Sequence, residues 1–293
     1  MSNNARAYDH LVLSVNELEQ AREFYTRLGF TMTPVAVHPF GTHNTLAQLQ
    51  GNFLEVLSVN NPSLIKEHSN TAFSFAAFNR DYLSDHEGFS MVVYQGNDAV
   101  KDAAEFAAKG LCQLDPFDFS RKALLPDGEE VTVSFSLAFV THEGMPRSAF
   151  FTCHQHAPQY FWKPEYQSHE NTASAIIETM MVAENPEQYT EFFTKLLNST
   201  ANTDTNGVLT FATNGGSFSV LTPDQWHSRF ASEVCPDLAN GPRLAGYRIA
   251  VADLNKTKDC LTHNTIAFAP SKAGIFISAE IAHGCVIEFT EQT

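Results

Sequence analysis

The alternation of apolar and polar positions predicts the same supersecondary unit four times along the chain. In the first copy, residues 10–15 form an apolar run of strand length, and apolar side chains at helical spacing follow it. Asn16 with Glu19 three residues later is typical of a helix start, and Gly29 of a helix end. Three further strand-like runs complete a βαβββ unit, at residues 30–38, 44–50 and 52–59.

The later copies repeat this order of elements. Their first strands are predicted at residues 89–95, 176–183 and 246–251. The helices that follow begin near Asn97 in the second copy, begin at Asn185-Pro186 in the third, and cover residues 254–261 in the fourth. The closing strands are predicted at residues 117–124, 131–139 and 148–154 in the second copy, where Pro126-Asp127-Gly128 joins the first two, and at residues 265–269, 274–279 and 285–290 in the fourth.

The copies also align residue by residue. Glu55 and Glu288 occupy the same point of the strands that end the first and fourth copies. At the offset that superposes the first and third copies, Glu178 takes the position of His10. The duplication favours two closely packed domains over one continuous domain, with a pair of modules in residues 1–160 and a second pair in residues 161–293.

Composition narrows the classes of function. A formal net charge of −15 disfavours nucleic-acid binding, which depends on Lys and Arg, and an anionic ligand would need a local cluster of positive groups. The five cysteines are odd in number and lack a CxxC pair, so we expect reduced thiols and a cytoplasmic protein. Neither a membrane-spanning stretch nor a signal-peptide core is evident, and serine-hydrolase, P-loop and dinucleotide-binding motifs are absent from the sequence.

Several motifs resemble one known superfamily. The segments are Asp9-His10-Leu-Val-Leu-Ser-Val, Phe40-Gly41-Thr42-x-Asn44, Gly51-x-Phe-Leu-Glu55, and Phe150-Phe151-x-x-His154-Gln-His156 with Trp162-Lys-Pro-Glu165 after it. They are similar to the vicinal oxygen chelate (VOC) superfamily, which includes glyoxalase I, bleomycin resistance proteins and extradiol dioxygenases. The branch that they resemble most is that of the glyoxalase-like domain proteins.

This resemblance implies an α+β fold in which four βαβββ modules form two cupped mixed β-sheets, or half-barrels, with helices on the outside. It also implies a divalent metal in the cup, held by residues of the first and last strands of a module. His10 and Glu55 match two of these positions, and a shift of two residues would bring in His154. Such a set suits Fe, Mn, Ni or Zn. In the second half, Glu178 and Glu288 match ligand positions without any histidine.

Each candidate has a plainer interpretation. His10 could cap the sheet through a hydrogen bond. Glu55 lies in an apolar run and therefore needs a partner, which could be a metal, His10 or Arg121. Strand alternation puts His154 and His156 on one face and Cys153 on the other.

Other candidates lie beside a turn and in the connection between the halves. His38 and His43, which flank the Pro39-Phe40-Gly41 turn, are interpreted first as loop residues and second as substrate contacts, and Glu165 as part of a linker.

Two functions remain open from the sequence. One is a metal-dependent lyase, isomerase or dioxygenase acting on a small oxygen-bearing substrate in the N-terminal cup, with His10, Glu55 and His154 on the metal. Glu55, His156 and Glu165 would then be the candidates for catalytic roles. The other is a metal-free protein that binds or sequesters a small molecule, as bleomycin resistance proteins do. Four modules in one chain could close both cups internally, so a monomer or a homodimer is expected.

Overall fold

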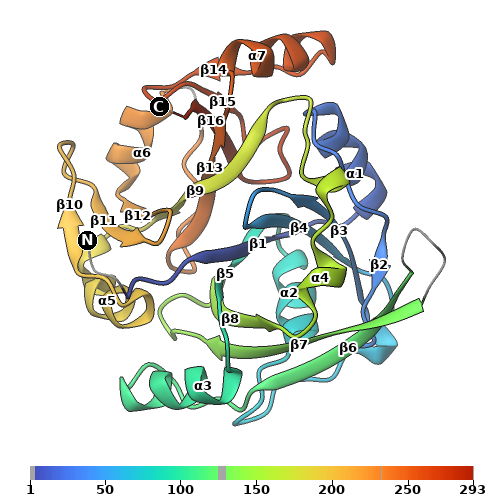
Figure 1. The fold of residues 1–293 in the computed structure, drawn as a ribbon. Coiled ribbons are helices and arrows are strands. Elements are labelled where there is room, and N and C mark those ends of the chain that lie inside the picture. Colours follow the sequence, from blue (N-terminus) through green and yellow to red (C-terminus); the bar gives the residue numbers. More distant parts are fainter. Residues whose placement is uncertain (1–3, 125–129, 232, 293) are drawn as a thin grey trace.

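Within residues 4–124, 130–231 and 233–292, which the computed structural model describes, the strands form two eight-stranded mixed sheets (Figure 1). The first has the order β2-β3-β4-β1-β5-β8-β7-β6, and the second β10-β11-β12-β9-β13-β16-β15-β14. The first sheet contains β1 (Tyr8–Ser14), β2 (Ala36–Val37), β3 (Thr42–Gln48), β4 (Phe53–Val59), β5 (Gly88–Gln95), β6 (Phe117–Leu124), β7 (Glu130–Val140) and β8 (Ala149–Gln155). The second contains β9 (Ala173–Val182), β10 (Ala201–Thr203), β11 (Leu209–Thr213), β12 (Gly216–Leu221), β13 (Arg243–Val251), β14 (Ala269–Pro270), β15 (Ile275–Ile277) and β16 (Val286–Glu291).

The predicted βαβββ modules are confirmed by the strand pairing. Each module begins and ends with strands that lie side by side in parallel, as in the pairs β1–β4, β5–β8, β9–β12 and β13–β16. The first strands of two modules then pair antiparallel, β1 with β5 and β9 with β13, and so join two modules into one sheet. The α+β fold of two cupped sheets with helices outside is therefore also confirmed.

Helices follow the first strand of each module. They are α1 (Leu18–Arg27), α3 (Ala99–Ala108), α5 (Thr190–Leu197) and α7 (Leu254–His263). Three more α-helices lie in connections, α2 (Phe75–Leu83), α4 (Pro158–Phe161) and α6 (Pro223–Arg229), together with the 3-10 turns η1 (Pro62–Leu64), η2 (Pro164–Tyr166) and η3 (Pro186–Tyr189). The N-cap of α1 is Glu17 rather than Asn16, and that of α3 is Asp98, whose side chain accepts a hydrogen bond from Lys101 N.

Other sequence predictions need correction in the connections. Of the strand predicted over residues 30–38, only Ala36–Val37 pairs in the sheet, because Pro34 lacks the N–H that a strand needs. The strand predicted over residues 265–269 is reduced to Ala269–Pro270. The turn predicted at residues 126–128 lies outside the described residues.

The two faces of each sheet have different neighbours. Leu11 and Tyr247, from different halves of the chain, belong to one large core that also includes the apolar faces of the helices. The opposite, concave face of each sheet has its own smaller cluster, with Val12 and Phe151 in the first and Met180 and Phe276 in the second. Because strand residues alternate between faces, each sheet contributes to the shared core and to a separate cup.

The boundary predicted after residue 160, between the two pairs of modules, stays a prediction. The segment that follows it packs on the first sheet, since Phe161 lines the first cup and Lys163 N donates a hydrogen bond of 3.1 Å to the Gln48 side chain. The halves are also joined by a hydrogen bond of 3.0 Å between the hydroxyl groups of Tyr25 and Tyr247.

Candidate functional site

The cup of the first sheet contains a cavity with mostly aromatic walls. It holds about 490 Å³ of empty space, its open mouth included. The apolar lining includes Phe40, Phe53, Phe75, Phe119, Phe135 and Phe151. The polar side chains in the lining are His10, His38, Asn44, Glu55 and Arg121.

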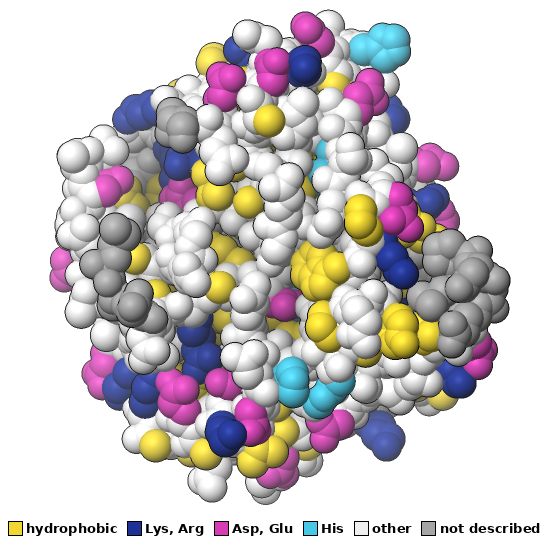
Figure 2. Space-filling view, viewed as in Figure 1, with side chains coloured by type: hydrophobic (Ala, Val, Ile, Leu, Met, Phe, Trp, Pro, Cys, Tyr) yellow, Lys and Arg dark blue, Asp and Glu magenta, His cyan; other side chains and the backbone are white. Residues whose placement is uncertain are grey.

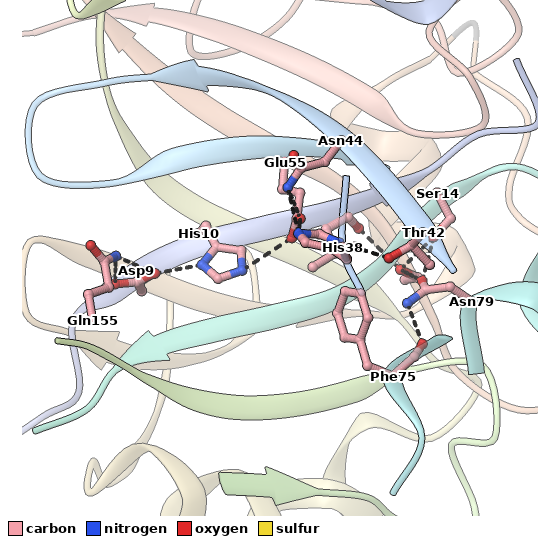
Figure 3. A network of polar contacts seen from close by, with 12 residues as sticks. Asp9, His10, Ser14, His38, Thr42, Asn44, Glu55, Phe75, Asn79 and Gln155 are labelled. Carbon is pink, nitrogen blue, oxygen red and sulfur yellow. Dashed lines mark hydrogen bonds and ion pairs between the residues drawn. The ribbon is translucent and has the colours of Figure 1, made fainter. Parts of the chain in front are cut away.

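His10 and Glu55 meet in this cup, as the alignment of strand positions predicts. They project from the adjacent parallel strands β1 and β4, and His10 Nε2 lies 3.5 Å from Glu55 Oε2 (Figure 3). On the other side of the ring, His10 Nδ1 is hydrogen-bonded to Asp9 Oδ1 at 2.6 Å. Asp9 in turn accepts a hydrogen bond of 3.0 Å from the Gln155 amide. The imidazole is therefore held in one orientation by a carboxylate at each nitrogen.

The charges of this pair follow from its surroundings. Burial alone would lower the pKa of His10, but its contacts with Asp9 and Glu55 raise that pKa to about 9. Burial alone would raise the pKa of Glu55, yet the neighbouring His10 brings it below its usual value. At neutral pH the cup therefore holds an imidazolium beside a carboxylate, both almost fully buried.

The second oxygen of Glu55 is also occupied. Asn44 Nδ2 donates a hydrogen bond of 2.5 Å to Glu55 Oε1, and His38 Nε2 lies 4.0 Å from the same oxygen. His38 Nδ1 is hydrogen-bonded to Thr42 Oγ1 at 2.8 Å. Burial lowers the pKa of His38 to about 4, so its ring is neutral at pH 7 and can accept from Asn44 Nδ2, 3.3 Å away.

Helix α2, which the sequence did not predict, positions part of the cup wall. Asn79 Oδ1 accepts hydrogen bonds from Ser14 at 2.5 Å and from Ser90 at 2.9 Å, on the neighbouring strands β1 and β5. The Asn79 amide donates to the carbonyl oxygen of Phe75 at 2.9 Å. This buried network fixes α2 against the sheet and directs the Phe75 ring into the cavity (Figure 3).

The structure does not bring His154 to His10 and Glu55. On β8, Phe151 and Cys153 line the cup, and alternation turns His154 to the other face. There its ring lies 4.1 Å from that of His156, whose Nε2 is hydrogen-bonded to Ser136 Oγ at 2.8 Å on the exposed surface. A shift of two residues along β8 stays on one face of the strand, and the face that carries His154 points away from the cup.

Glu165 lies outside the cup. It is exposed on η2 and lines a larger groove that adjoins the mouth of the cavity and shares Asn44 and Arg121 with it. Figure 2 shows hydrophobic side chains gathered over α4, beside this groove, on the face of Figure 1.

A divalent metal fits the cup only in part. His10 and Glu55 could supply two donors, and the Asp9 contact would orient His10 as second-shell carboxylates orient metal ligands. Among the residues of the described ranges, however, no three His, Cys, Asp or Glu side chains are grouped so that they could hold an ion. His154, the expected third ligand, does not line the cup, so His10 and Glu55 do not complete a metal site among the described residues.

The second cup has a different polar centre. Glu178 on β9 and Glu288 on β16 converge, as their alignment with His10 and Glu55 predicts, but two arginines fill the space between them. Arg229 contacts Glu178 at 2.8 Å and Glu288 at 2.5 Å, and Arg248 contacts them at 3.0 Å and 2.8 Å. The two carboxylates are thus neutralised by guanidinium groups of the chain itself.

Three residues of the first cup have a larger part in it than their sequence context predicts. His38 was assigned to a loop, although it is buried against Glu55. Asn44 was assigned to a turn motif and to the start of the strand predicted over residues 44–50. Arg121 was named as one possible partner of Glu55. The signal for Arg121 was available, because it alternates with Phe117 and Phe119 along β6 and so shares their face.

A pair of fused βαβββ cups, one of them with a buried imidazole and carboxylate, defines a protein of the VOC fold. The chain belongs to the glyoxalase-like domain family of this superfamily, because the family model "Glyoxalase-like domain" matches residues 8–197. The resemblance noted from the sequence motifs is therefore confirmed. No curated protein matches the chain.

Solved structures share the fold at low sequence identity. A hypothetical protein from Staphylococcus aureus is similar with a TM-score of 0.69 and 12% identity, over 97% of this chain and 99% of that one. A mutant of 4-hydroxymandelate synthase from Streptomyces coelicolor follows with a TM-score of 0.57 and 10% identity, over 99% and 93% of the two chains. A xylose isomerase-like TIM barrel/4-hydroxyphenylpyruvate dioxygenase fusion protein gives 0.52 and 12%, over 98% of this chain and 49% of that one. At these identities the likeness concerns the fold.

The expectations about the cellular setting rest on the sequence. None of the helices in the described part of the chain is long and apolar enough to cross a membrane. A cytoplasmic location, a monomeric or homodimeric state and the lack of nucleic-acid binding stay predictions.

Proposed function

We propose that the N-terminal cup binds a small, largely apolar molecule through an oxygen atom that contacts the His10–Glu55 pair. The observation that carries this proposal is a buried ion pair in a cavity whose remaining walls are mostly phenyl rings. Removing two charges from water is costly, and replacing such a pair by apolar residues is often neutral or stabilising. A pair retained in an apolar cavity is therefore better explained by a ligand than by stability.

The shape of the cavity agrees with a flat ligand. Its walls combine many apolar rings with a few convergent polar groups, as is usual in small-molecule sites. Phe53 already stacks on the His10 ring with 4.4 Å between centroids, and Phe151 meets that ring edge-on. A planar group entering the cup would find further phenyl faces and edges, which favour aromatic partners.

The pair is also suited to moving protons. A protonated His10 can donate to a ligand oxygen, while an ionised Glu55 can accept a proton from a neighbouring carbon or hydroxyl. Two titratable groups whose surroundings push their pKa values apart are typical of an acid and a base in one site. We therefore infer an isomerase or lyase step in which Glu55 is the base and His10 the acid.

A metal-dependent form of this activity is supported by one observation, the orientation of His10 by Asp9. His10 and Glu55 would be the protein ligands. The described residues give no third ligand, so no step of the proposed proton transfer depends on an ion.

Binding without turnover is supported by a different observation. Every nitrogen and carboxylate oxygen of the pair already has a neighbour within the protein, in Asp9, Asn44 or the partner itself. A site so well satisfied can hold a ligand without reacting with it.

Binding is measured first, and turnover is measured afterwards on the compounds that bind. Hydroxylated aromatic compounds and aryl ketones are titrated calorimetrically against the wild type and against Leu137→Phe, which adds a ring inside the cup. Val100→Phe, on an exposed position of α3, is the control. We expect binding to the wild type and to the control and its loss in Leu137→Phe. Binding that persists in Leu137→Phe would locate the ligand elsewhere.

Bound ketones are then incubated in D₂O and followed by NMR. Exchange of the hydrogen next to the carbonyl that disappears in Glu55→Gln supports the acid–base step. Binding without exchange favours the sequestering function.

A further inference from the structure

Arg121 is a cation in the wall of the first cup that has no ion-pair partner among the described residues. Its side chain lines both the aromatic cavity and the outer groove. It makes no hydrogen bond or ion pair with any residue that the structure describes. Glu55, whose charge acts on Arg121, is already held by His10 and Asn44.

This arrangement leaves the guanidinium available to a ligand. A guanidinium carries five N–H donors, and the half-buried position of Arg121 removes part of their hydration without giving them an acceptor among the described residues. Burial lowers the pKa of Arg121 below its usual value, which reflects this loss. The two arginines of the second cup show the contrast, because Arg229 and Arg248 each contact two carboxylates.

The side chain of Asn44, at the same place, has an acceptor without a hydrogen bond in the described structure. Its amide nitrogen donates to Glu55 and lies within reach of His38, while its oxygen Oδ1 is buried and accepts no hydrogen bond in the described structure. Asn44 and Arg121 both line the boundary between the cavity and the groove. Among the described residues, the throat of the cup therefore presents a cation without an ion pair and an acceptor without a hydrogen bond to any ligand that enters it.

We propose that the ligand of this cup is a carboxylic acid with an aromatic body, whose carboxylate binds Arg121 while its ring lies among the phenyl side chains. This inference rests on the proposed function and names the class of its ligand. The Asn44 oxygen would accept from a hydroxyl or N–H group close to that carboxylate. A planar guanidinium matches the two oxygens of a carboxylate, and its single charge matches the single charge of the acid.

The overall charge of the protein makes such a local cation necessary. A net charge of −15 repels anions on average, so an anionic ligand depends on positive groups near its site. Lys122 and Lys163 line the outer groove and add positive charge along the approach to Arg121. Lys122 is itself paired with Glu130 at 2.8 Å, whereas Arg121, at the throat, makes no ion pair with a described residue.

The experiment uses two matched pairs of probes, phenylacetate with phenylacetamide and 3-phenylpropionate with 3-phenylpropionamide. Each amide keeps the shape of its acid but lacks the charge. Dissociation constants are measured by NMR titration for the wild type, Arg121→Gln and Arg121→Lys. Lys101→Gln, which removes an exposed positive charge on α3, is the control.

We expect the wild type and the control to bind at least one acid about tenfold more tightly than its amide. Arg121→Gln should lose this preference while it still binds the amide, and Arg121→Lys should keep only part of it. Equal binding of acid and amide by the wild type, or a preference that survives in Arg121→Gln, would overturn the inference and leave the proposed function intact. If neither member of either pair binds the wild type, the inference fails together with the proposed aromatic ligand.

Discussion

Arg229 holds the carboxylate of Glu178 with two hydrogen bonds, of 3.0 Å and 2.8 Å. Glu178 stands where His10 stands in the first half of the duplicated chain. One cup thus pairs an imidazole with a carboxylate inside an aromatic cavity, and the other closes two carboxylates with arginines from its own strand and helix. The same scaffold therefore has one polar centre open to a ligand and one that is neutralised internally.

We expect Arg229→Gln to destabilise the protein by about 3 kcal/mol, because it leaves Glu178 and Glu288 buried with Arg248 alone. Urea unfolding at pH 7 measures the change. Arg22→Gln, which removes an exposed ion pair to Glu19, should cost less than about 1 kcal/mol. A loss in Arg229→Gln no larger than in this control would contradict the structural role of the cluster.

His10 should make stability depend on pH. Its pKa is raised from an unfolded value near 6.5 to about 9, so the stabilisation is complete below about pH 6.5 and is lost as the pH rises through 9. We expect the difference in unfolding free energy between the wild type and His10→Gln to shrink by about 3 kcal/mol from pH 6 to pH 9.5.

The matched control for this series is His263→Gln, on an exposed position at the end of α7. Its stability should follow the wild type at every pH. Curves for the wild type and His10→Gln that stay parallel would mean that His10 is not charged in the folded protein.

Glu55→Gln should lower the pKa of His10, because it removes one of the two carboxylates that favour the charged ring. We expect a fall of about one unit, with Asp9 still holding the other nitrogen. NMR titration of the imidazole protons measures it. Glu19→Gln, at an exposed position on α1, should leave the titration unchanged, and an unchanged titration in Glu55→Gln would show that the two side chains do not interact in solution.

The sequence predicted the parts of this structure that depend on repeated local patterns. Strand alternation and helix periodicity recur in each module, and the alignment of Glu55 with Glu288 correctly placed both at the centre of a cup. The sequence did not determine which strand face points into the cup where the register was uncertain, as it was for His154. One residue of register along β8 decides whether Cys153 or His154 faces the cavity.

Residues from connections were also hard to predict. Arg229 lies in a short helix and Phe75 in another, and each reaches its cup through tertiary packing that leaves little periodic signal. His38 directly follows β2, at the end of the strand predicted over residues 30–38, and the Pro39-Phe40-Gly41 turn beside it favoured its interpretation as a loop residue. Its position depends on hydrogen bonds to Thr42 and Asn44, which only the folded chain brings into place.

The first cup offers few ligands for the metal that the motifs imply. Structural and catalytic zinc sites use three or four protein ligands, and the first cup offers His10 and Glu55 among the described residues. We therefore expect the dissociation constants for Zn(II), Mn(II), Fe(II) and Ni(II) to exceed about 1 µM, which is far above the dissociation constants of structural zinc sites. Elemental analysis and competition with a chromophoric chelator measure this. One equivalent of tightly bound ion that is lost in His10→Gln but kept in His154→Gln would contradict the expectation and favour the metal-dependent alternative. Loss of the ion in both variants would mean that β8 adopts another register in solution, with His154 inside the cup.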